Sequence, residues 1–335
     1  MLHRSRLSAP VLVALILMTA SLQQGCTISR AQKSEDCKSV AKKIVLVAGD
    51  EEYRSEETLP QFARILEAHH GFDCTVLFPI DPKDGTVNPG VNDNIPGLEA
   101  LESADLLVLF TRFRDLPDDQ AKHLIGYIES GRPIVAMRTA THAFFMKKHK
   151  TYAQYSWNNK EWDGGFGRQV LGETWVAHHG HHGKESTRGV LVEGMENHPI
   201  LRGFGDVWGP TDVYTVTLPL PGDSTPLVLG QVLTGMNPDD KPLAGPKNNP
   251  MMPVAWTKTY TTKSGKKART FTTTMGSSQD FESVGLRRLL VNACYWGLEL
   301  EDKIPAESDV SIVGKFAPTP FGFLAFQKGL RPEDF

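Results

Sequence analysis

The sequence predicts an α/β fold organised around a doubly wound, mostly parallel sheet, with β-rich additions in its second half. Short apolar runs without polar interruption are typical of parallel strands covered on both faces, and such runs occupy 43–48, 105–110 and 133–137. Segments with a helical apolar face alternate with them, as right-handed strand–helix–strand crossovers require. Each run also stops abruptly in charged or hydroxyl side chains.

Strands and helices are expected to alternate in the first half. In chain order the expected elements are strand 43–48, helix 58–70, strand 74–78, short helix 95–103, strand 105–110, helix 118–130 and strand 133–137. The two longer helices are each followed by a glycine, Gly71 and Gly131, and glycine is a common helix terminator. A loop rich in Pro, Gly and Asn at 81–96 separates the second strand from the third.

The second half is expected to be rich in strands. After a short helix at 166–171, the predicted strands are 190–193, 213–218, 227–232, 254–261 and 269–274. A helix at 283–298 with a continuous apolar face closes the domain. From Ile304 onward the chain is proline-rich, and its phenylalanines are expected to hold it on the surface of the domain.

Polar side chains follow the three apolar runs at the points where the strands end. They are Glu51, Glu52 and Arg54 after the first run, Arg112 and Arg114 after the second, and Arg138, Thr139, Thr141 and His142 after the third. Ligands of open α/β sheets bind beyond the carboxyl ends of the strands, so these residues are expected to line one site. Their mixture of acids, bases and guanidinium groups suits an anionic or polyhydroxylated small molecule.

The side-chain chemistry suggests a role for each candidate. The candidate catalytic residues, which would donate and accept protons, are Glu51, Glu52 and His142. The candidate substrate-binding residues are Arg54, Arg114, Arg138, Thr139 and Asp212, since guanidinium groups hold oxygen functions by bidentate bonds. Two structural alternatives stay open. The arginines could form salt bridges across the rim, or Thr139 and Thr141 could cap the next helix while Arg138 pairs with a surface acid.

A histidine cluster between His178 and His182 is a candidate metal site. Imidazole is the commonest neutral metal ligand, and His142, His178 and His182 could bind one divalent ion together with a carboxylate from Glu51, Glu52 or Asp212. Such a nitrogen-and-oxygen set suits Zn, Mn or Fe without choosing among them. The alternative is an exposed cluster that binds metal only adventitiously.

The N-terminus has the composition of an export signal. Arg4 and Arg6 precede the apolar run 11–18, which is too short to span a bilayer. The expected signal peptide is 1–26, with Cys26 a candidate lipid-bearing residue, and 27–42 is expected to be a linker. The protein is therefore expected in the periplasm or cell envelope, attached to a membrane only through its signal or a lipid anchor.

Composition and motifs exclude several classes of function. The formal charge of −3 over 335 residues gives no electrostatic footprint for nucleic acid. The four cysteines form neither a disulfide framework nor a CxxC metal pattern, and Cys74 and Cys294 are most simply apolar fillers. No phosphate-cradling glycine loop follows a strand. At the end of the third predicted strand, Thr139 and Thr141 are the only candidate nucleophiles.

Several segments resemble the ThuA-like, or trehalose-utilisation, proteins of the class I glutamine amidotransferase-like superfamily. They are GDEEYRSEE, MRTATHAF, HHGHHGKESTRG, ENHPILRGFGDVWGPTDVY, MPVAWTKTY and RTFTTTMGSSQDFESVGLRRLLVNACYWGLEL. The likeness covers 43–300 and is to a secreted, planctomycete-type subgroup. It leaves 301–335 as a C-terminal extension.

The resemblance implies a flavodoxin-like fold and a role in disaccharide metabolism through 3-keto sugars. It does not imply glutaminase activity, because the nucleophilic cysteine of the amidotransferases is missing here. Some smaller relatives bind zinc through two histidines where this sequence has Arg138 and Ser277. The chain is thus expected to act on a sugar or 3-keto glycoside by hydrolysis, elimination or isomerisation. The alternative is a non-catalytic carbohydrate-binding or scaffold protein at the cell surface, whose aromatic segment 152–162 would stack on sugars.

Overall fold

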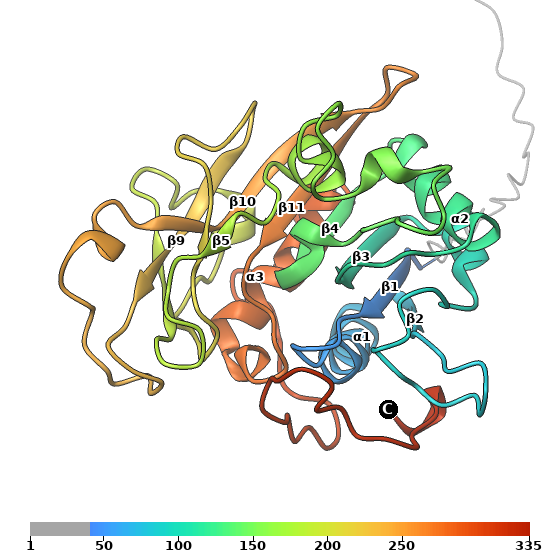
Figure 1. Cartoon of the computed structure of the whole chain (residues 1–335). Helices are drawn as coiled ribbons and strands as arrows, with labels where there is room; N and C mark the ends of the chain where they lie inside the picture. Colours follow the sequence, from blue (N-terminus) through green and yellow to red (C-terminus); the bar gives the residue numbers. More distant parts are fainter. Residues whose placement is uncertain (1–40) are drawn as a thin grey trace, which may run out of the picture. The chain divides into compact units, whose positions relative to one another are not determined.

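One mixed sheet runs through the described part of the chain, residues 41–335 of a computed structural model, with strands in the order β2-β1-β3-β4-β11-β10-β9-β6-β7 (Figure 1). Its strands are β1 (Lys43–Gly49), β2 (Asp73–Leu77), β3 (Leu106–Thr111), β4 (Ile134–Met137), β6 (Thr187–Leu191), β7 (Val207–Gly209), β9 (Thr225–Val232), β10 (Met252–Thr261) and β11 (Lys267–Thr273). Two short strands, β5 (Ala177–His178) and β8 (Tyr214–Thr215), form a separate antiparallel pair. The predicted signal peptide and nearly all of the predicted linker lie outside the described residues.

The sheet has a parallel half and an antiparallel half. β1 pairs in parallel with β2 and β3, and β4 pairs in parallel with β3 and β11. From β10 onward, every pairing of the sheet is antiparallel. The predicted α/β fold with β-rich additions is therefore confirmed.

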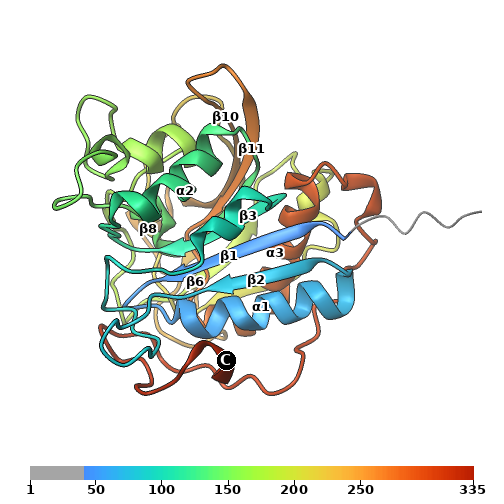
Figure 2. The ribbon, with the colours of Figure 1, turned by 90° about the vertical axis from the view of Figure 1, so that its right-hand side faces the viewer.

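Helices cover both faces of the parallel half because its strands are apolar on both sides. α1 (Ser55–His70) and α3 (Val284–Gly297) pack with Ile44 and Leu46, whereas α2 (Asp118–Glu129) packs with Val45 and Val47. This alternation is the two-residue period of a strand buried on both faces. Figure 2 shows α1 and α2 on opposite sides of β1 and β3.

The remaining helical elements are single turns. They are Leu98–Glu102, Arg138–His142, Ala153–Tyr155, Gly167–Leu171, Pro199–Leu201, Pro246–Asn248, Asp280–Glu282, Glu301–Lys303 and Pro332–Asp334. None of the helices in 41–335 combines the length and the apolar character that a membrane span needs.

The structure departs from the predicted elements where the local pattern is weak. The predicted strand 213–218 contracts to Tyr214–Thr215, and the predicted strand 190–193 moves to Thr187–Leu191. The helix α1 begins at Ser55, and the acidic residues of its first turn, Glu56 and Glu57, are favourable near a helix N-terminus. Cys74 and Cys294 are both free thiols.

The C-terminal extension lies against α1, beside β2 (Figures 1 and 2). His70 near the end of this helix contacts the Asp309 carbonyl, and Glu57 near its start accepts hydrogen bonds from Thr319. Arg64 donates to the backbone oxygen of Phe335 over 2.7 Å. The extension therefore runs from the C-terminal end of α1 to its N-terminal end, at the edge where the parallel strands end, and then turns back to Arg64 near the middle of the helix.

Candidate functional site

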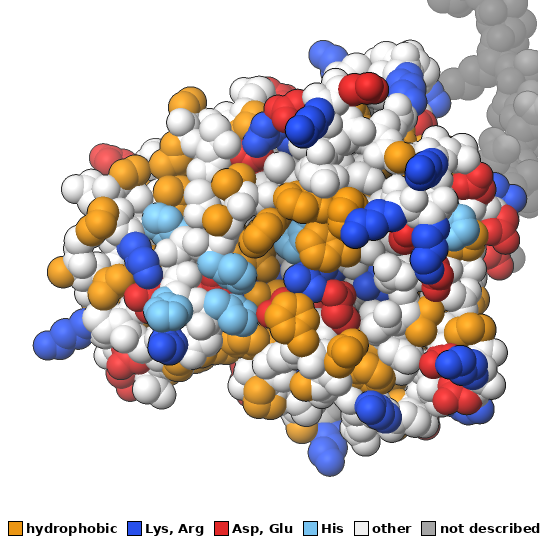
Figure 3. All heavy atoms as spheres, viewed as in Figure 1, with side chains coloured by type: hydrophobic (Ala, Val, Ile, Leu, Met, Phe, Trp, Pro, Cys, Tyr) orange, Lys and Arg blue, Asp and Glu red, His pale blue; other side chains and the backbone are white. Residues whose placement is uncertain are grey.

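The carboxyl ends of β1, β3 and β4 meet at one edge of the sheet, as expected for parallel neighbours. The amide of Arg112 donates to the Gly49 carbonyl over 2.8 Å, and the amide of Phe113 donates to the His142 carbonyl over 3.0 Å. These bonds continue the pairing beyond the strands and bring the three polar loops together. Figure 3 shows acidic and basic side chains near the middle of this face, with hydrophobic side chains and histidines around them.

Arg138, at the end of β4, is fully buried and forms the floor of the site. Its Nη2 donates to Asp212 Oδ1 over 2.9 Å, and its Nη1 donates to the backbone carbonyls of Asp212 and Thr274. The guanidinium carbon lies 4.4 Å from the ring centroid of Tyr53 and 3.9 Å from that of Tyr214. A guanidinium held between aromatic rings and a carboxylate is fixed in place.

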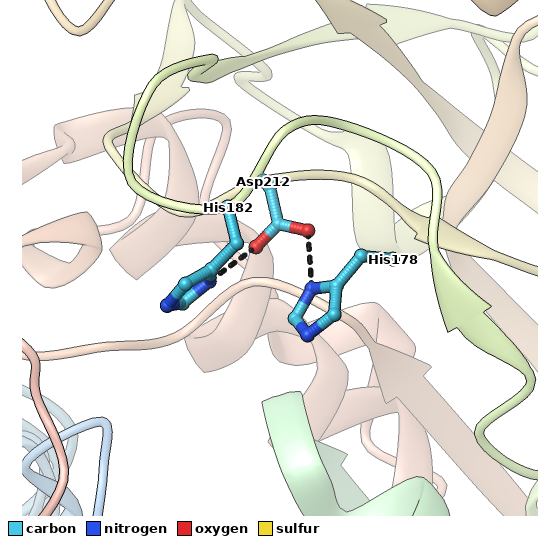
Figure 4. Close-up of side chains that lie close together, drawn as sticks. All are labelled: His178, His182 and Asp212. Atoms are coloured by element: carbon cyan, nitrogen blue, oxygen red, sulfur yellow. Dashed lines mark hydrogen bonds and ion pairs between the residues drawn. The ribbon is translucent and has the colours of Figure 1, made fainter.

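Asp212 holds two imidazoles in addition to Arg138 (Figure 4). His178 Nδ1 donates to Asp212 Oδ2 over 2.7 Å, and His182 Nδ1 lies 3.1 Å from Oδ1. Burial alone would raise the pKa of Asp212, but the hydrogen bonds from His178 and His182 hold it well below its usual range. Asp212 therefore stays ionised and orients both rings.

The two histidines differ in what their second nitrogen meets. His182 Nε2 lies 3.3 Å from Glu52 Oε1, so this ring bridges two carboxylates. The hydrogen bond with Asp212 raises the pKa of His182. For His178, no partner of Nε2 is present among residues 41–335, and its side chain is 40% exposed. The hydrogen bond with Asp212 thus favours the protonated form of His182, whereas His178 keeps an Nε2 that is unpaired among the described residues.

Glu51 and Glu52 follow β1 and face different partners, as their adjacency predicts. Glu51 forms ion pairs with Arg112 and with Arg114, the latter over 3.2 Å. Glu52 is buried beside His182 and lies 3.9 Å from Arg112 Nη2. Burial, followed by repulsion from Asp50, raises the pKa of both glutamates. Of the two, Glu52 is the one placed beside the imidazoles.

Thr139 and His142 serve as inner supports of the site. The Thr139 hydroxyl donates to the buried carboxylate of Asp50 instead of capping a helix. His142 is buried between the rings of Phe113 and Trp175, with centroid distances of 5.0 and 5.6 Å. Burial lowers the pKa of His142 well below its ordinary value. This imidazole is therefore neutral at neutral pH.

Arg54 and Arg114 are also buried, and both hold backbone carbonyls. Arg114 donates to the carbonyls of Pro89 and Val91 as well as to Glu51. Arg54 donates to the carbonyls of Glu52 and Gly322. The salt-bridge alternative raised for the arginines thus describes Arg114 with Glu51 and Arg138 with Asp212. Arg54 lies 3.5 Å from Glu56 and packs beneath the loop.

The sequence model of the family described as trehalose utilisation, ThuA, matches residues 43–297. The chain belongs to the ThuA family. A solved ThuA-like protein from Parabacteroides merdae has the same fold, with a TM-score of 0.51 and 16% identity over 84% of this chain and 97% of that one. A second ThuA-like protein, from Bacteroides uniformis, aligns at a TM-score of 0.46 and 15% identity, over 76% of this chain and 90% of that one. Among curated proteins, none matches the sequence significantly.

The ThuA assignment indicates a carbohydrate-related role, and the site chemistry agrees with a polar ligand. His178, His182 and Asp212 could hold a metal, because one ligand atom from each lies within 4.8 Å of the other two. Two imidazole nitrogens and a carboxylate oxygen fit a divalent transition metal by donor type. The structure does not bring His142 into this group.

Sequence reasoning named most of these residues but missed the pieces that join them. Tyr53 and Tyr214 enclose the Arg138 guanidinium, and Asp50 anchors Thr139. Asp50 could have been found, since it directly follows β1 and precedes the two glutamates. Nothing in the local pattern of either tyrosine indicates a contact with Arg138.

Proposed function

We propose that this ThuA protein is an exported carbohydrate-active enzyme that acts on a sugar or 3-keto glycoside. The observation that supports it is a single buried carboxylate, Asp212, that orients two partly exposed imidazoles, of which His182 has a raised pKa. Paired general acid and base groups are the common requirement of glycoside hydrolysis, elimination and isomerisation.

The roles follow from what the second ring nitrogen of each imidazole meets. In its neutral form, His178 donates the Nδ1 proton to Asp212, which leaves an Nε2 lone pair that can accept a proton from substrate or water. His182, with its raised pKa, can donate a proton to a departing oxygen. Glu52, beside its Nε2, can then take part in the reprotonation of His182. In a 3-keto glycoside, His178 accepts the proton from the carbon between the carbonyl and the glycosidic carbon. The C–H electron pair forms the new C=C bond, and the glycosidic oxygen departs with the proton of His182.

A metal-bound form is the alternative chemistry of the same residues, because an imidazole that ligates an ion could not also accept or donate the protons described above. His178, His182 and Asp212 would bind one Zn, Mn or Fe ion, and a bound ion would polarise a carbonyl or water. Elemental analysis of the purified protein tests this. Stoichiometric metal that is lost in a His178→Ala/His182→Ala variant is the expected result, and metal below a tenth of an equivalent would refute it.

Export is the second part of the proposal. The basic residues Arg4 and Arg6 before the apolar run 11–18 support a signal peptide ending near Cys26. The likeness to a secreted, planctomycete-type subgroup agrees with this address. Mass spectrometry of the mature chain tests it: a lipid-modified N-terminal Cys26 is expected for an anchored form, and an intact Met1 would contradict export.

A binding protein is the second candidate, and one observation favours it. The rings of Phe113, Phe145 and Trp157 pack together, with centroid distances of 5.8 to 6.2 Å, and could stack on a sugar without chemistry. Such a protein would belong to the cell surface and would need no proton transfer.

Turnover of a 3-keto glucoside, followed by NMR, separates the two candidates. For the enzyme, His178→Gln and His182→Gln should each lower kcat by about 10²- to 10⁴-fold. The exposed neighbour His181 is the matched control, and His181→Gln should leave the rate unchanged. Sugar binding without turnover, unaffected by His178→Gln, would establish the binding protein instead.

A further inference from the structure

The C-terminal extension reaches the candidate site, although it lies outside the residues that the family model matches, 43–297. The amide of Gly322 donates to the Glu52 carbonyl, and the amide of Leu324 donates to the Glu51 carbonyl, both over 2.8 Å. Arg54 holds the Gly322 carbonyl from below. Residues 319–324 are thereby fixed, by backbone bonds, to the loop that carries both glutamates.

Two phenylalanines of this segment contact side chains of the site. The ring of Phe321 lies 5.5 Å from that of Tyr53 and 5.3 Å from that of His182. The Arg112 guanidinium carbon lies between two rings, 4.9 Å from the centroid of Phe323 and 4.7 Å from that of Phe113. Because Arg112 also pairs with Glu51, its guanidinium plane is held in a fixed position.

These contacts close a continuous chain of flat side chains that begins and ends in the extension. Each neighbour in the chain lies 4.7 to 5.9 Å from the next, in the order Phe321, His182, His178, Trp175, Trp157, Phe113, Arg112 and Phe323. We call this the aromatic rim. Without the extension the rim would be open between Arg112 and His182.

The rim is exposed where the extension contributes to it. Phe323 is 62% exposed and Leu324 is 56% exposed, and Val176, next to Trp175 in the sequence, is 44% exposed. Exposed apolar side chains that gather around a polar floor mark a ligand site more often than an ordinary surface. Figure 3 shows hydrophobic side chains on both sides of the charged ones on this face.

From this arrangement we propose that the extension completes the ligand site. The exposed face of the Phe323 ring, whose other face lies against the Arg112 guanidinium, forms a stacking subsite for the second ring of a two-ring glycoside, while its first sugar lies over Asp212 and the imidazoles. This inference rests on the proposed carbohydrate function. The second ring is either another sugar, which presents its C–H face, or an aromatic aglycone, since both offer a flat apolar face to an aromatic side chain.

Calorimetric binding to the full chain tests the subsite with three probes. Methyl α-glucopyranoside has one ring, trehalose has two sugar rings, and 4-nitrophenyl α-glucopyranoside has one sugar and one aromatic ring. The variant is Phe323→Ala, whose exposed side chain can be removed with little effect on folding. Ile312→Ala is the control, because Ile312 is an exposed apolar residue of the same extension beside Ser311, which contacts His69 near the far end of α1.

Phe323→Ala is expected to weaken a two-ring probe about three- to tenfold while binding of the methyl glucoside stays unchanged. Loss confined to trehalose identifies a second sugar, and loss confined to the nitrophenyl glucoside identifies an aromatic aglycone. Unchanged binding of both two-ring probes, or an equal loss for all three probes, would overturn the subsite and leave the proposed function standing. A wild-type chain that binds no probe would refute the proposed carbohydrate function, and the subsite with it.

Discussion

Two buried arginines in this protein meet a buried carboxylate in opposite ways. Arg54 follows β1 and Arg138 follows β4, both are fully buried, and both have a left-handed backbone, with φ of 60° and 43°. Their carboxylate partners are Glu56 and Asp212. The backbone position is therefore alike, and the difference lies in the partners.

Hydrogen bonding accounts for the difference. Asp212 accepts from Arg138, His178 and His182, and its pKa is lowered. Glu56 lies 3.5 Å from Arg54, but neither of its oxygens has a hydrogen-bond partner among the described residues, and burial raises the pKa of Glu56 to about 8. A nearby cation is thus insufficient to keep a buried carboxylate ionised; donors directed at its oxygens are needed.

The largest expected effect on stability comes from the Arg138–Asp212 pair, whose carboxylate accepts several hydrogen bonds. Asp212→Asn leaves the Arg138 guanidinium buried without a counter-charge, which should cost about 3–5 kcal/mol of unfolding free energy. Urea denaturation followed by tryptophan fluorescence measures it.

A surface pair of the antiparallel half provides the control. Asp223 pairs with Lys258 over 2.7 Å at the protein surface, so Asp223→Asn should change the unfolding free energy by less than about 1 kcal/mol. Equal losses in the two variants would mean that Arg138 is not held by Asp212, and the comparison would fail.

The second expected effect concerns the Arg54–Glu56 pair and is a dependence of protein stability on pH. The pKa of Glu56 is raised from 4.5 to about 8, so the folded protein keeps this proton longer than the unfolded chain does. Its contribution to stability is complete below pH 4.5 and is lost as pH rises towards 8. Glu56→Gln should remove this decline, which is up to about 1 kcal/mol of unfolding free energy per pH unit. Melting temperatures measured from pH 5 to 8 would then fall less in the variant than in the wild type.

Glu57 offers a matched control for the pH slope. It is the next residue of α1, but its carboxylate accepts hydrogen bonds from Thr319. Glu57→Gln should keep the wild-type slope. If Glu56→Gln kept it too, the Glu56 carboxylate would be ionised in the fold despite its missing hydrogen bonds.

The parallel half of the site could be predicted from sequence because a general rule places it. Uninterrupted apolar runs identify β1, β3 and β4, and parallel neighbours must end at the same edge. Glu52 and Arg138 were therefore expected near each other without knowledge of any contact. The same rule could not say which arginine would be supporting and which would face the imidazoles.

The rest could not be predicted because it depends on contacts between distant segments. Asp212 lies 74 positions from Arg138 and is carried by a loop before β8, which is only Tyr214–Thr215. So short a strand has no periodicity to detect. Phe321 was expected only to hold the tail on the surface, and its contact with His182 arises from the path of the extension around α1.

The smallest expected effect concerns His182, the imidazole that lies between Asp212 and Glu52. The hydrogen bond with Asp212 raises its pKa above 6.5, so its stabilising contribution is complete below pH 6.5 and is lost as pH rises through the folded-state pKa. His182→Gln should therefore destabilise the protein more at pH 6 than at pH 9, by less than about 1 kcal/mol because the ring is partly exposed to solvent. In NMR titrations the His182 pKa should fall in Asp212→Asn. An unchanged His182 pKa in that variant would show that Asp212 orients the ring without stabilising its charge, and the acid role proposed for His182 would lose its physical basis.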